Sequence, residues 1–166
     1  MIKDVTAASC VEFAIKTEEL GAEIYQALAR KFASDRELRE LFEGLGRDEV
    51  HHGEQIRGLQ KRLDPRFRQP VPAEQQDYLR AMSLSDVFSG PMGPARDVEG
   101  IRSRDDALER ALNLEKATLS YYLAVREVVG PDEVLDSLIA MEKKHVVKVM
   151  QLLITGARFR GLADAF

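Results

Sequence analysis

The stretch LRELFEGLGRDEVHHGEQIRGLQKRL, residues 38–63, decides the fold class. Alternating steps of three and four along it join mostly apolar residues into one seam, the spacing of a helix that faces a bundle axis. Only Glu49 and His52, in the middle of the seam, are not apolar. The complete seam is Leu38, Phe42, Leu45, Glu49, His52, Ile56, Leu59 and Leu63. The pattern predicts a long helix with a polar centre.

Three further segments have the same periodicity, and recognisable end signals bound all four. We expect helices over 6–33, 35–63, 104–129 and 131–155. Ser34 with Glu37 forms a capping box before the second, and Ser103 opens the third. Pro131 suits the first position of the fourth, which we expect to end near Thr155 and Gly156. The sequence therefore predicts an all-α fold.

The connection between the second and third helices, residues 64–103, contains five of the six prolines. Its composition predicts one short helix over 73–82 and irregular chain over 86–100. The flanking hairpins look like copies, because residues 14–19 align with 111–116, and 45–52 align with 138–145. A duplicated hairpin joined by a long crossover predicts a four-helix bundle with approximate two-fold symmetry, as one domain over residues 1–166.

Composition excludes several function classes. The 166 residues include 24 Lys and Arg against 28 Asp and Glu, a net charge of −4, so we expect no nucleic-acid partner. The single cysteine, Cys10, excludes an internal disulfide and a site made of several thiolates, and we expect it to be buried. No apolar run is long enough for a membrane span or a secretion signal, so the expected compartment is the cytoplasm.

The seams of the other three helices are also interrupted by polar residues at their centres. They are Ala14, Glu18, Gly21, Tyr25, Leu28 and Phe32; Leu108, Ala111, Glu115, Thr118, Tyr122, Val125 and Val129; and Leu135, Leu138, Glu142, His145, Val149 and Leu152. Four glutamates and two histidines thus converge on one interior layer. Four unneutralised buried carboxylates are very unfavourable, and two imidazoles do not balance them, so a salt-bridged network without metal is the weaker interpretation.

Two divalent cations would neutralise the four carboxylates. Residues three apart on a helix are neighbours, so Glu49 with His52, and Glu142 with His145, can each bind one ion, while Glu49 and Glu142 can bridge the pair. The predicted metal ligands are Glu18, Glu49, His52, Glu115, Glu142 and His145. Mixed carboxylate and imidazole ligands without thiolate fit iron or manganese best, with zinc possible, and two iron ions are the expected cofactor.

These residues resemble the ferritin-like di-iron carboxylate proteins, specifically the rubrerythrin-like branch. The resemblance spans all four helices and includes Tyr25 and Tyr122, each seven residues after a ligand glutamate. The two tyrosines are either ordinary core residues or groups that support the ligands. Two departures are that the sequence has no rubredoxin-like four-cysteine domain, and that Thr118 stands where peroxidase-type rubrerythrins have an extra glutamate.

The sequence says less about the roles of three further positions around the layer. His51 lies off the seam, and we expect it at the surface. Gly21 and Thr118 lie one turn after Glu18 and Glu115, and two readings stay open there: an oxidant pocket, or close helix packing with a satisfied threonine hydroxyl.

The resemblance implies a non-haem di-iron oxidoreductase that reduces hydrogen peroxide or dioxygen. Its electrons would come from a separate rubredoxin-like protein or flavoprotein, and it would form a homodimer. Three alternatives remain: a ferroxidase or iron-handling protein, an oxygen-activating hydroxylase on an organic substrate, and a zinc-stabilised scaffold without redox turnover. The tail, residues 157–166, either caps the bundle or contacts a second subunit.

Overall fold

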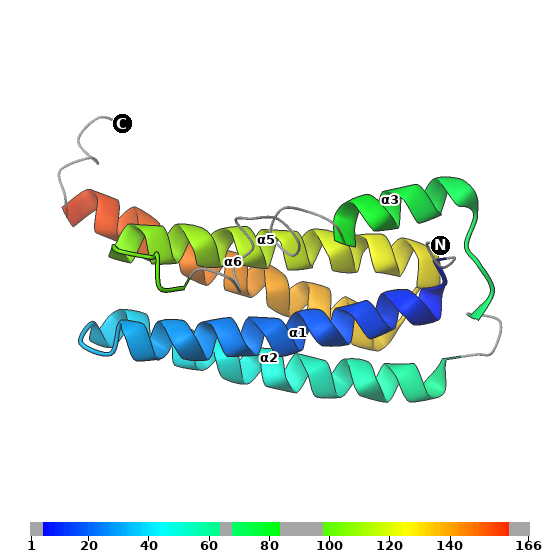
Figure 1. Ribbon diagram of the computed structural model, residues 1–166, viewed down its shortest axis with the longest axis horizontal. Coiled ribbons are helices and arrows are strands. Elements are labelled where there is room, and N and C mark those ends of the chain that lie inside the picture. The colour runs from blue at the N-terminus through cyan, green and yellow to red at the C-terminus, as the bar shows by residue number, and fades with distance from the viewer. Residues whose placement is uncertain (1–4, 64–67, 84–97, 160–166) are drawn as a thin grey trace.

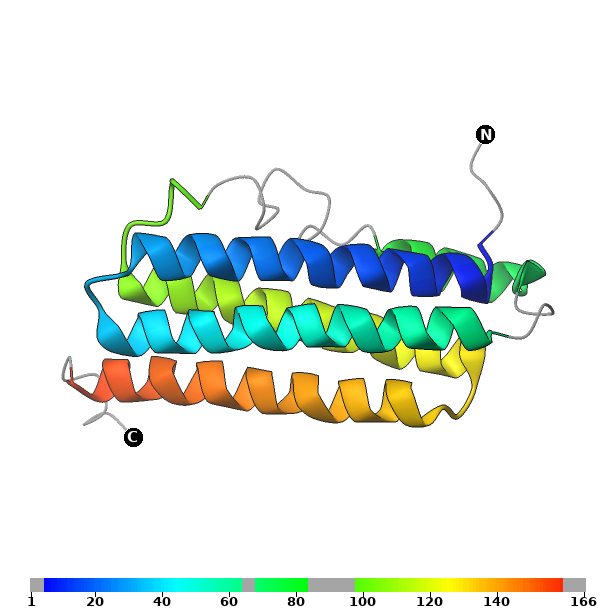
Figure 2. The ribbon, with the colours of Figure 1, turned by 90° about the horizontal axis from the view of Figure 1, so that it is seen from below.

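The computed structural model of the chain describes residues 5–63, 68–83 and 98–159. The helices within these ranges are α1 (Ala7–Lys31), α2 (Arg36–Arg62), α3 (Ala73–Ser83), α5 (Arg104–Val129) and α6 (Glu133–Phe159). Figure 1 shows α1 beside α2 and α5 beside α6 as antiparallel hairpins, with α3 outside the bundle. Seen from below, the four long helices run the length of the molecule (Figure 2). The predicted all-α, ferritin-like four-helix bundle is confirmed.

The long crossover has a simple geometric cause. Helix α2 ends at one end of the bundle, and α5 begins at the opposite end (Figure 1). The chain must therefore travel back along the bundle, and α3 lies on that route as predicted. Val71 of the crossover is tied to the N-terminal segment, because its N–H donates to the Val5 carbonyl at 3.0 Å. Residues 86–97 of the segment predicted to be irregular, 86–100, lie outside the described residues.

The start of α2 differs from the prediction. Asp35, not Ser34, caps this helix, and its carboxylate accepts a hydrogen bond from the Leu38 N–H at 3.1 Å. Arg104 explains the choice, because it pairs with the Asp35 carboxylate at 2.6 Å and also with Glu37. Glu37 therefore binds an arginine at the start of α5 instead of closing a capping box. This contact between two helix starts is not visible in local sequence.

The ends of α5 and α6 agree with the prediction only in part. Ser103 caps α5, accepting from the Asp106 N–H at 3.1 Å. Helix α6 begins at Glu133 and not at Pro131, because Asp132 accepts a hydrogen bond from the Val134 N–H at 2.8 Å.

The end of α6 was also predicted wrongly, since the helix continues past Gly156 to Phe159. Thr155 donates its hydroxyl hydrogen to the Gln151 carbonyl, a bond within the helix at 2.8 Å. One glycine weakens a helix by only about 1 kcal/mol and does not by itself end it. Residues 160–166 of the tail lie outside the described residues.

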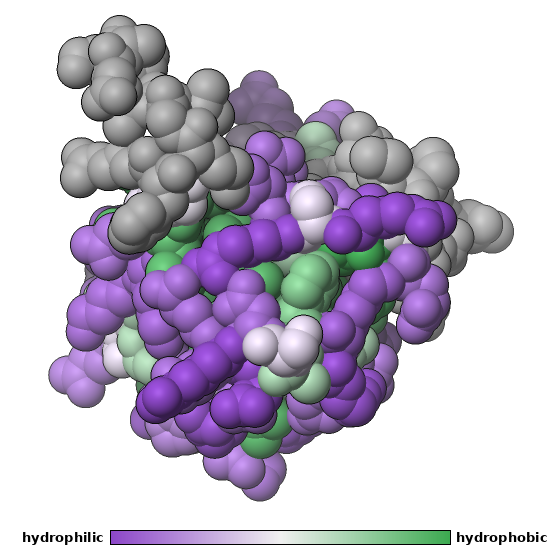
Figure 3. Space-filling model, turned by 90° about the vertical axis from the view of Figure 1, so that its left-hand side faces the viewer, coloured by the Kyte–Doolittle hydropathy of each residue, from purple (hydrophilic) through white to green (hydrophobic). Residues whose placement is uncertain are grey.

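The core consists of two apolar clusters with the polar layer between them. One cluster, towards the α1–α2 turn, includes Leu28, Leu38 and Phe42. The other, towards the start of α1, includes Val11 and Ile56. Seam positions are buried along each helix except the last one, which is half-buried, so the periodicity placed the inward faces correctly. These half-buried positions are Phe32, Leu63, Val129 and Leu152. Seen from the α1–α2 turn, hydrophilic residues cover most of the outer surface, with apolar side chains between them (Figure 3).

Among the helices of the described ranges, none carries an apolar stretch that could cross a membrane.

Candidate metal centre

The structure brings all six predicted ligands together at the middle of the bundle. Each of the four long helices contributes, and all six side chains are buried: Glu18 from α1, Glu49 and His52 from α2, Glu115 from α5, and Glu142 and His145 from α6. The hairpin geometry achieves this because the polar residues occupy the same level of four aligned seams. His51, next to the ligand His52, is exposed as predicted.

The six residues form two overlapping groups. In the first, Glu18, Glu49, His52 and Glu142 each offer an atom, and these atoms all lie within 4.8 Å of one another. The second group meets the same criterion, and its members are Glu49, Glu115, Glu142 and His145. We call these groups the Glu18 half-site and the Glu115 half-site. Both share Glu49 and Glu142, the two residues expected to bridge a metal pair.

The Glu18 half-site is arranged around one imidazole nitrogen. His52 Nδ1 lies 3.0 Å from Glu142 Oε1, 3.3 Å from Glu49 Oε2 and 3.4 Å from Glu18 Oε2. A ring nitrogen carries at most one proton, so it cannot satisfy three carboxylates. Within the part of the chain that the structure describes, neither oxygen of Glu18 or Glu142 has a hydrogen-bond partner, and neither does either His52 nitrogen. Buried acceptors and an imidazole without partners fit a cation-binding site.

The electrostatics of the layer support the same conclusion. Burial, followed by the neighbouring carboxylates, raises the pKa of Glu49 and of Glu142 well above the ordinary value, and burial also raises the pKa of Glu18. Burial alone would lower the pKa of His52, but the three surrounding carboxylates outweigh it and raise this pKa to about 12. The metal-free layer therefore retains protons that bound divalent cations would replace.

The Glu115 half-site has more internal contacts. The Tyr25 hydroxyl donates a hydrogen bond to Glu115 Oε1, and His145 Nδ1 lies 3.3 Å from Glu115 Oε2. The other ring nitrogen of His145, Nε2, lies 3.1 Å from Asp48 Oδ2. A carboxylate at the outer nitrogen of a histidine ligand fixes the ring orientation and makes the inner nitrogen a better ligand.

Sequence reasoning missed Asp48. It lies directly before Glu49 but off the inward seam, and its side chain is 43% exposed. An exposed acidic residue on a charged helix has no distinctive local signal. Its contact with His145 arises only from the packing of α2 against α6.

The two predicted supporting tyrosines differ. Tyr25 reaches a ligand, as described above, and burial raises its pKa well above the ordinary value, so it keeps its proton. Tyr122 is also fully buried, but its hydroxyl has no hydrogen-bond partner among the described residues. Its neighbour Tyr121 instead donates to the Cys10 carbonyl at 2.9 Å, and Cys10 is buried as expected.

The structure favours close packing over an oxidant pocket at Gly21. A Cβ atom placed there would lie 3.4 Å from both Cγ and Cδ of Glu49. The Glu49 side chain therefore already fills the space beside Gly21 up to contact distance with a methyl group, which leaves no room for a larger side chain. Thr118, at the corresponding position of α5, is buried.

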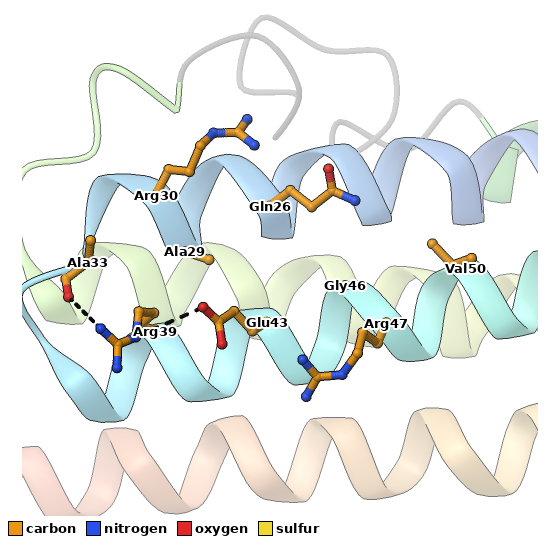
Figure 4. A pocket seen from close by; sticks show the side chains of 9 residues that line it. All are labelled: Gln26, Ala29, Arg30, Ala33, Arg39, Glu43, Gly46, Arg47 and Val50. Carbon is orange, nitrogen blue, oxygen red and sulfur yellow. Dashed lines mark hydrogen bonds and ion pairs between the residues drawn. The ribbon is translucent and has the colours of Figure 1, made fainter.

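A groove of about 530 Å³ lies on the outside of α1 and α2 (Figure 4). Gly46 forms part of its wall, and a Cβ there would lie 3.4 Å from Cβ of Tyr25. Tyr25 in turn contacts Glu115. The groove is thus outside the ligand layer, and Tyr25 lies between the groove and the layer. The residues that line the groove are Gln26, Ala29, Arg30, Ala33, Arg39, Glu43, Gly46, Arg47 and Val50.

The bundle and its buried carboxylate–histidine layer define a ferritin-like protein with a candidate metal site. The rubrerythrin family model matches residues 10–88, which contain α1 from its fourth residue on, all of α2 and α3, and the candidate ligands of the first hairpin. This match supports a ferritin-like, rubrerythrin-like family for the chain. Searches of curated proteins and of solved structures gave no significant match.

Proposed function

We propose that this chain is a non-haem di-iron oxidoreductase that reduces hydrogen peroxide with electrons from a separate donor. The observation that carries the proposal is the pair of overlapping half-sites that share Glu49 and Glu142. A single-ion site would not need two bridging carboxylates and two histidines on opposite hairpins. The rubrerythrin match over the first hairpin supports the same class.

Each residue has a defined task in this proposal. Glu18 and His52 would hold one ion, Glu115 and His145 would hold the other, and Glu49 and Glu142 would contribute to both positions. When bound, two iron(II) ions supply the two electrons that cleave the O–O bond of a peroxide. The four carboxylates compensate the charge of two divalent ions, and their burial excludes bulk water from the layer.

Tyr25 keeps a proton at the layer, because its hydroxyl donates to Glu115 and its pKa is well above the ordinary value. Reduction of one hydrogen peroxide to two waters consumes two electrons and two protons. The chain has one cysteine, which is buried, and so no dithiol that could supply the electrons. We therefore propose a rubredoxin-like protein or a flavoprotein as the donor, and a homodimer as the working assembly.

Stopped-flow oxidation of the anaerobically iron(II)-loaded protein tests the proposal, with hydrogen peroxide and dioxygen compared at equal concentration. We expect much faster oxidation by peroxide, and loss of this reaction in Glu142→Leu, which removes a bridging ligand. His51→Ala is the matched control, because His51 is exposed beside a ligand. Faster oxidation by dioxygen would contradict the proposal.

Preference for dioxygen would support the ferroxidase or iron-handling alternative, in which iron is itself the substrate. An organic-substrate hydroxylase has less support, because Glu49 occupies the room beside Gly21 that such a substrate would need. A tightly bound zinc ion with no oxidation by either reagent would support the scaffold alternative.

A further inference from the structure

The two hairpins correspond in sequence, but their contacts in the metal layer do not. The alignment pairs Glu18 with Glu115, His52 with His145, and Tyr25 with Tyr122. If the symmetry extended to the contacts, each half-site would be supported by the same hydrogen bonds. The structure shows one supported half-site and one unsupported half-site.

Every polar atom of the terminal ligands in the Glu115 half-site has a partner. The two oxygens of Glu115 contact the Tyr25 hydroxyl and His145 Nδ1. The second nitrogen of His145 contacts Asp48 at 3.1 Å. These contacts hold the glutamate and the imidazole in one orientation before any ion binds.

The corresponding atoms of the Glu18 half-site lack such support. Within the described residues, neither oxygen of Glu18, neither nitrogen of His52 and not the Tyr122 hydroxyl has a hydrogen-bond partner. The ion-pair contacts of His52 Nδ1, at 3.0–3.4 Å, are all to carboxylates of the layer itself and not to a supporting group such as Asp48 or Tyr25. The position that corresponds to Asp48 in the second hairpin is Met141, whose side chain has no carboxylate to orient His52.

The residues at the positions next to the glutamates also differ in size between the two hairpins. A Cβ at Gly53 would lie 3.6 Å from Cβ of Glu18, and one at Gly21 would lie 3.4 Å from Glu49, so two glycines face the glutamates of the first hairpin. The corresponding positions in the second hairpin are Val146 and Thr118. At both positions the first hairpin has a glycine where the second has a larger side chain.

We infer that the two metal positions are unequal: the position held by Glu115 and His145 fills first and retains its ion, and the position held by Glu18 and His52 fills second and exchanges. Preorganised ligands bind more tightly because less ordering accompanies binding. Loss of an outer partner of a metal-binding histidine lowers metal affinity by about 10–100-fold. Asp48 and Tyr25 are thus positioning residues. This inference rests on the two-metal site of the proposed function, but not on its reaction.

Anaerobic titration of the metal-free full chain with Co(II), followed by visible absorption and by competition with a chelator, tests the inference. We expect two ions per chain, with the first bound at least about tenfold more tightly. Glu18→Gln should remove the weak phase only, and Glu115→Gln should remove the tight phase. These two variants assign each phase to its half-site.

Asp48→Asn should weaken the tight phase by about 10–100-fold and leave the weak phase within about twofold. Glu54→Gln is the matched control, an exposed acidic residue on the same helix, and should change neither phase. In the converse variant, Met141→Asp, a carboxylate beside His52 should strengthen the weak phase. Circular dichroism of each metal-free variant verifies that it is folded.

Two equal phases in the wild type, or equal weakening of both phases by Asp48→Asn, would overturn the inference and leave the two-metal site intact. Failure to bind a second ion at any concentration would overturn the proposed function itself. The two failures are therefore distinguishable in one titration.

Discussion

Glu142→Leu should stabilise the metal-free protein while abolishing its stabilisation by metal. Glu142 is fully buried, and neither of its oxygens has a hydrogen-bond partner among residues 5–63, 68–83 and 98–159, although His52 Nδ1 lies 3.0 Å from one of them. An unsatisfied buried polar group costs about 1–3 kcal/mol, and more when charged. Replacing buried ionic groups by apolar side chains of similar volume is often stabilising by about 1–4 kcal/mol. For a chain of this length, a gain of about 2 kcal/mol raises Tm by roughly 4–8 °C.

The assay is urea and thermal unfolding of chelator-treated protein, with and without excess Mn(II). Wild type should gain about 2.7 kcal/mol for each metal position at which the free metal concentration is 100 times that position's Kd, and the variant should gain much less. Leu138→Ala, in the same seam one turn earlier, is the reference for loss of a buried side chain near the layer. Its free energy of unfolding should fall by about 2–5 kcal/mol. If metal-free Glu142→Leu is destabilised as strongly as Leu138→Ala, the layer is a satisfied salt-bridge network and the metal-site reasoning is refuted.

Three further predictions test the surroundings of the layer. Gly21→Val should displace Glu49 and weaken Mn(II) binding in both half-sites, measured by calorimetric titration; unchanged binding would refute close packing as the role of this glycine. Asp35→Ala should lose about 1 kcal/mol of stability at pH 7, whereas Asp35→Asn, which retains the cap, should lose less. Burial alone would raise the pKa of Asp35, but its hydrogen bonds to the backbone and to Arg104 lower this pKa. The stability that the ionised carboxylate contributes is therefore complete above about pH 4 and is lost as the pH falls further. Urea unfolding at pH 7 and pH 3 should therefore show a smaller difference between wild type and Asp35→Ala at pH 3, and an equal difference would contradict the assignment. Tyr121→Phe should cost about 0.5–1.5 kcal/mol without changing Mn(II) stoichiometry, and a lost metal ion would contradict its purely structural role.

The periodicity of the sequence predicted the inward faces and the ligand layer because both are properties of individual helices. A glutamate or histidine at the centre of an apolar seam must be buried wherever that seam is buried. Glu18, Glu49 and Glu142 could therefore be placed in one layer without knowledge of the helix positions. The shared membership of Glu49 and Glu142 in both half-sites agrees with the bridging expected of them.

Features that depend on contacts between helices were not predicted. Ser34 and Asp35 are both good caps, and Arg104 on another helix determines which one is used. Asp48 contacts His145 only because α2 packs against α6, and its position off the seam resembles that of any solvated acid. The sequence also could not tell what lies beside Gly21, because the side chain there, Glu49, comes from the neighbouring helix.

Approximate sequence symmetry also failed to predict the asymmetry of the site. Tyr25 and Tyr122 occupy equivalent positions, yet only Tyr25 contacts a ligand glutamate among the described residues. Side-chain partners depend on a few ångströms of packing, which a duplicated pattern does not determine.

Anomalous diffraction at the iron edge, from crystals of protein loaded anaerobically with iron(II), tests the central claim most directly. The account predicts two iron peaks in the buried layer, separated by roughly 3.5–4 Å. One should lie beside Glu18 and His52, the other beside Glu115 and His145, and both should contact Glu49 and Glu142. An iron-loaded crystal with no peak in this layer, or with a single peak bound by only one hairpin, would contradict it.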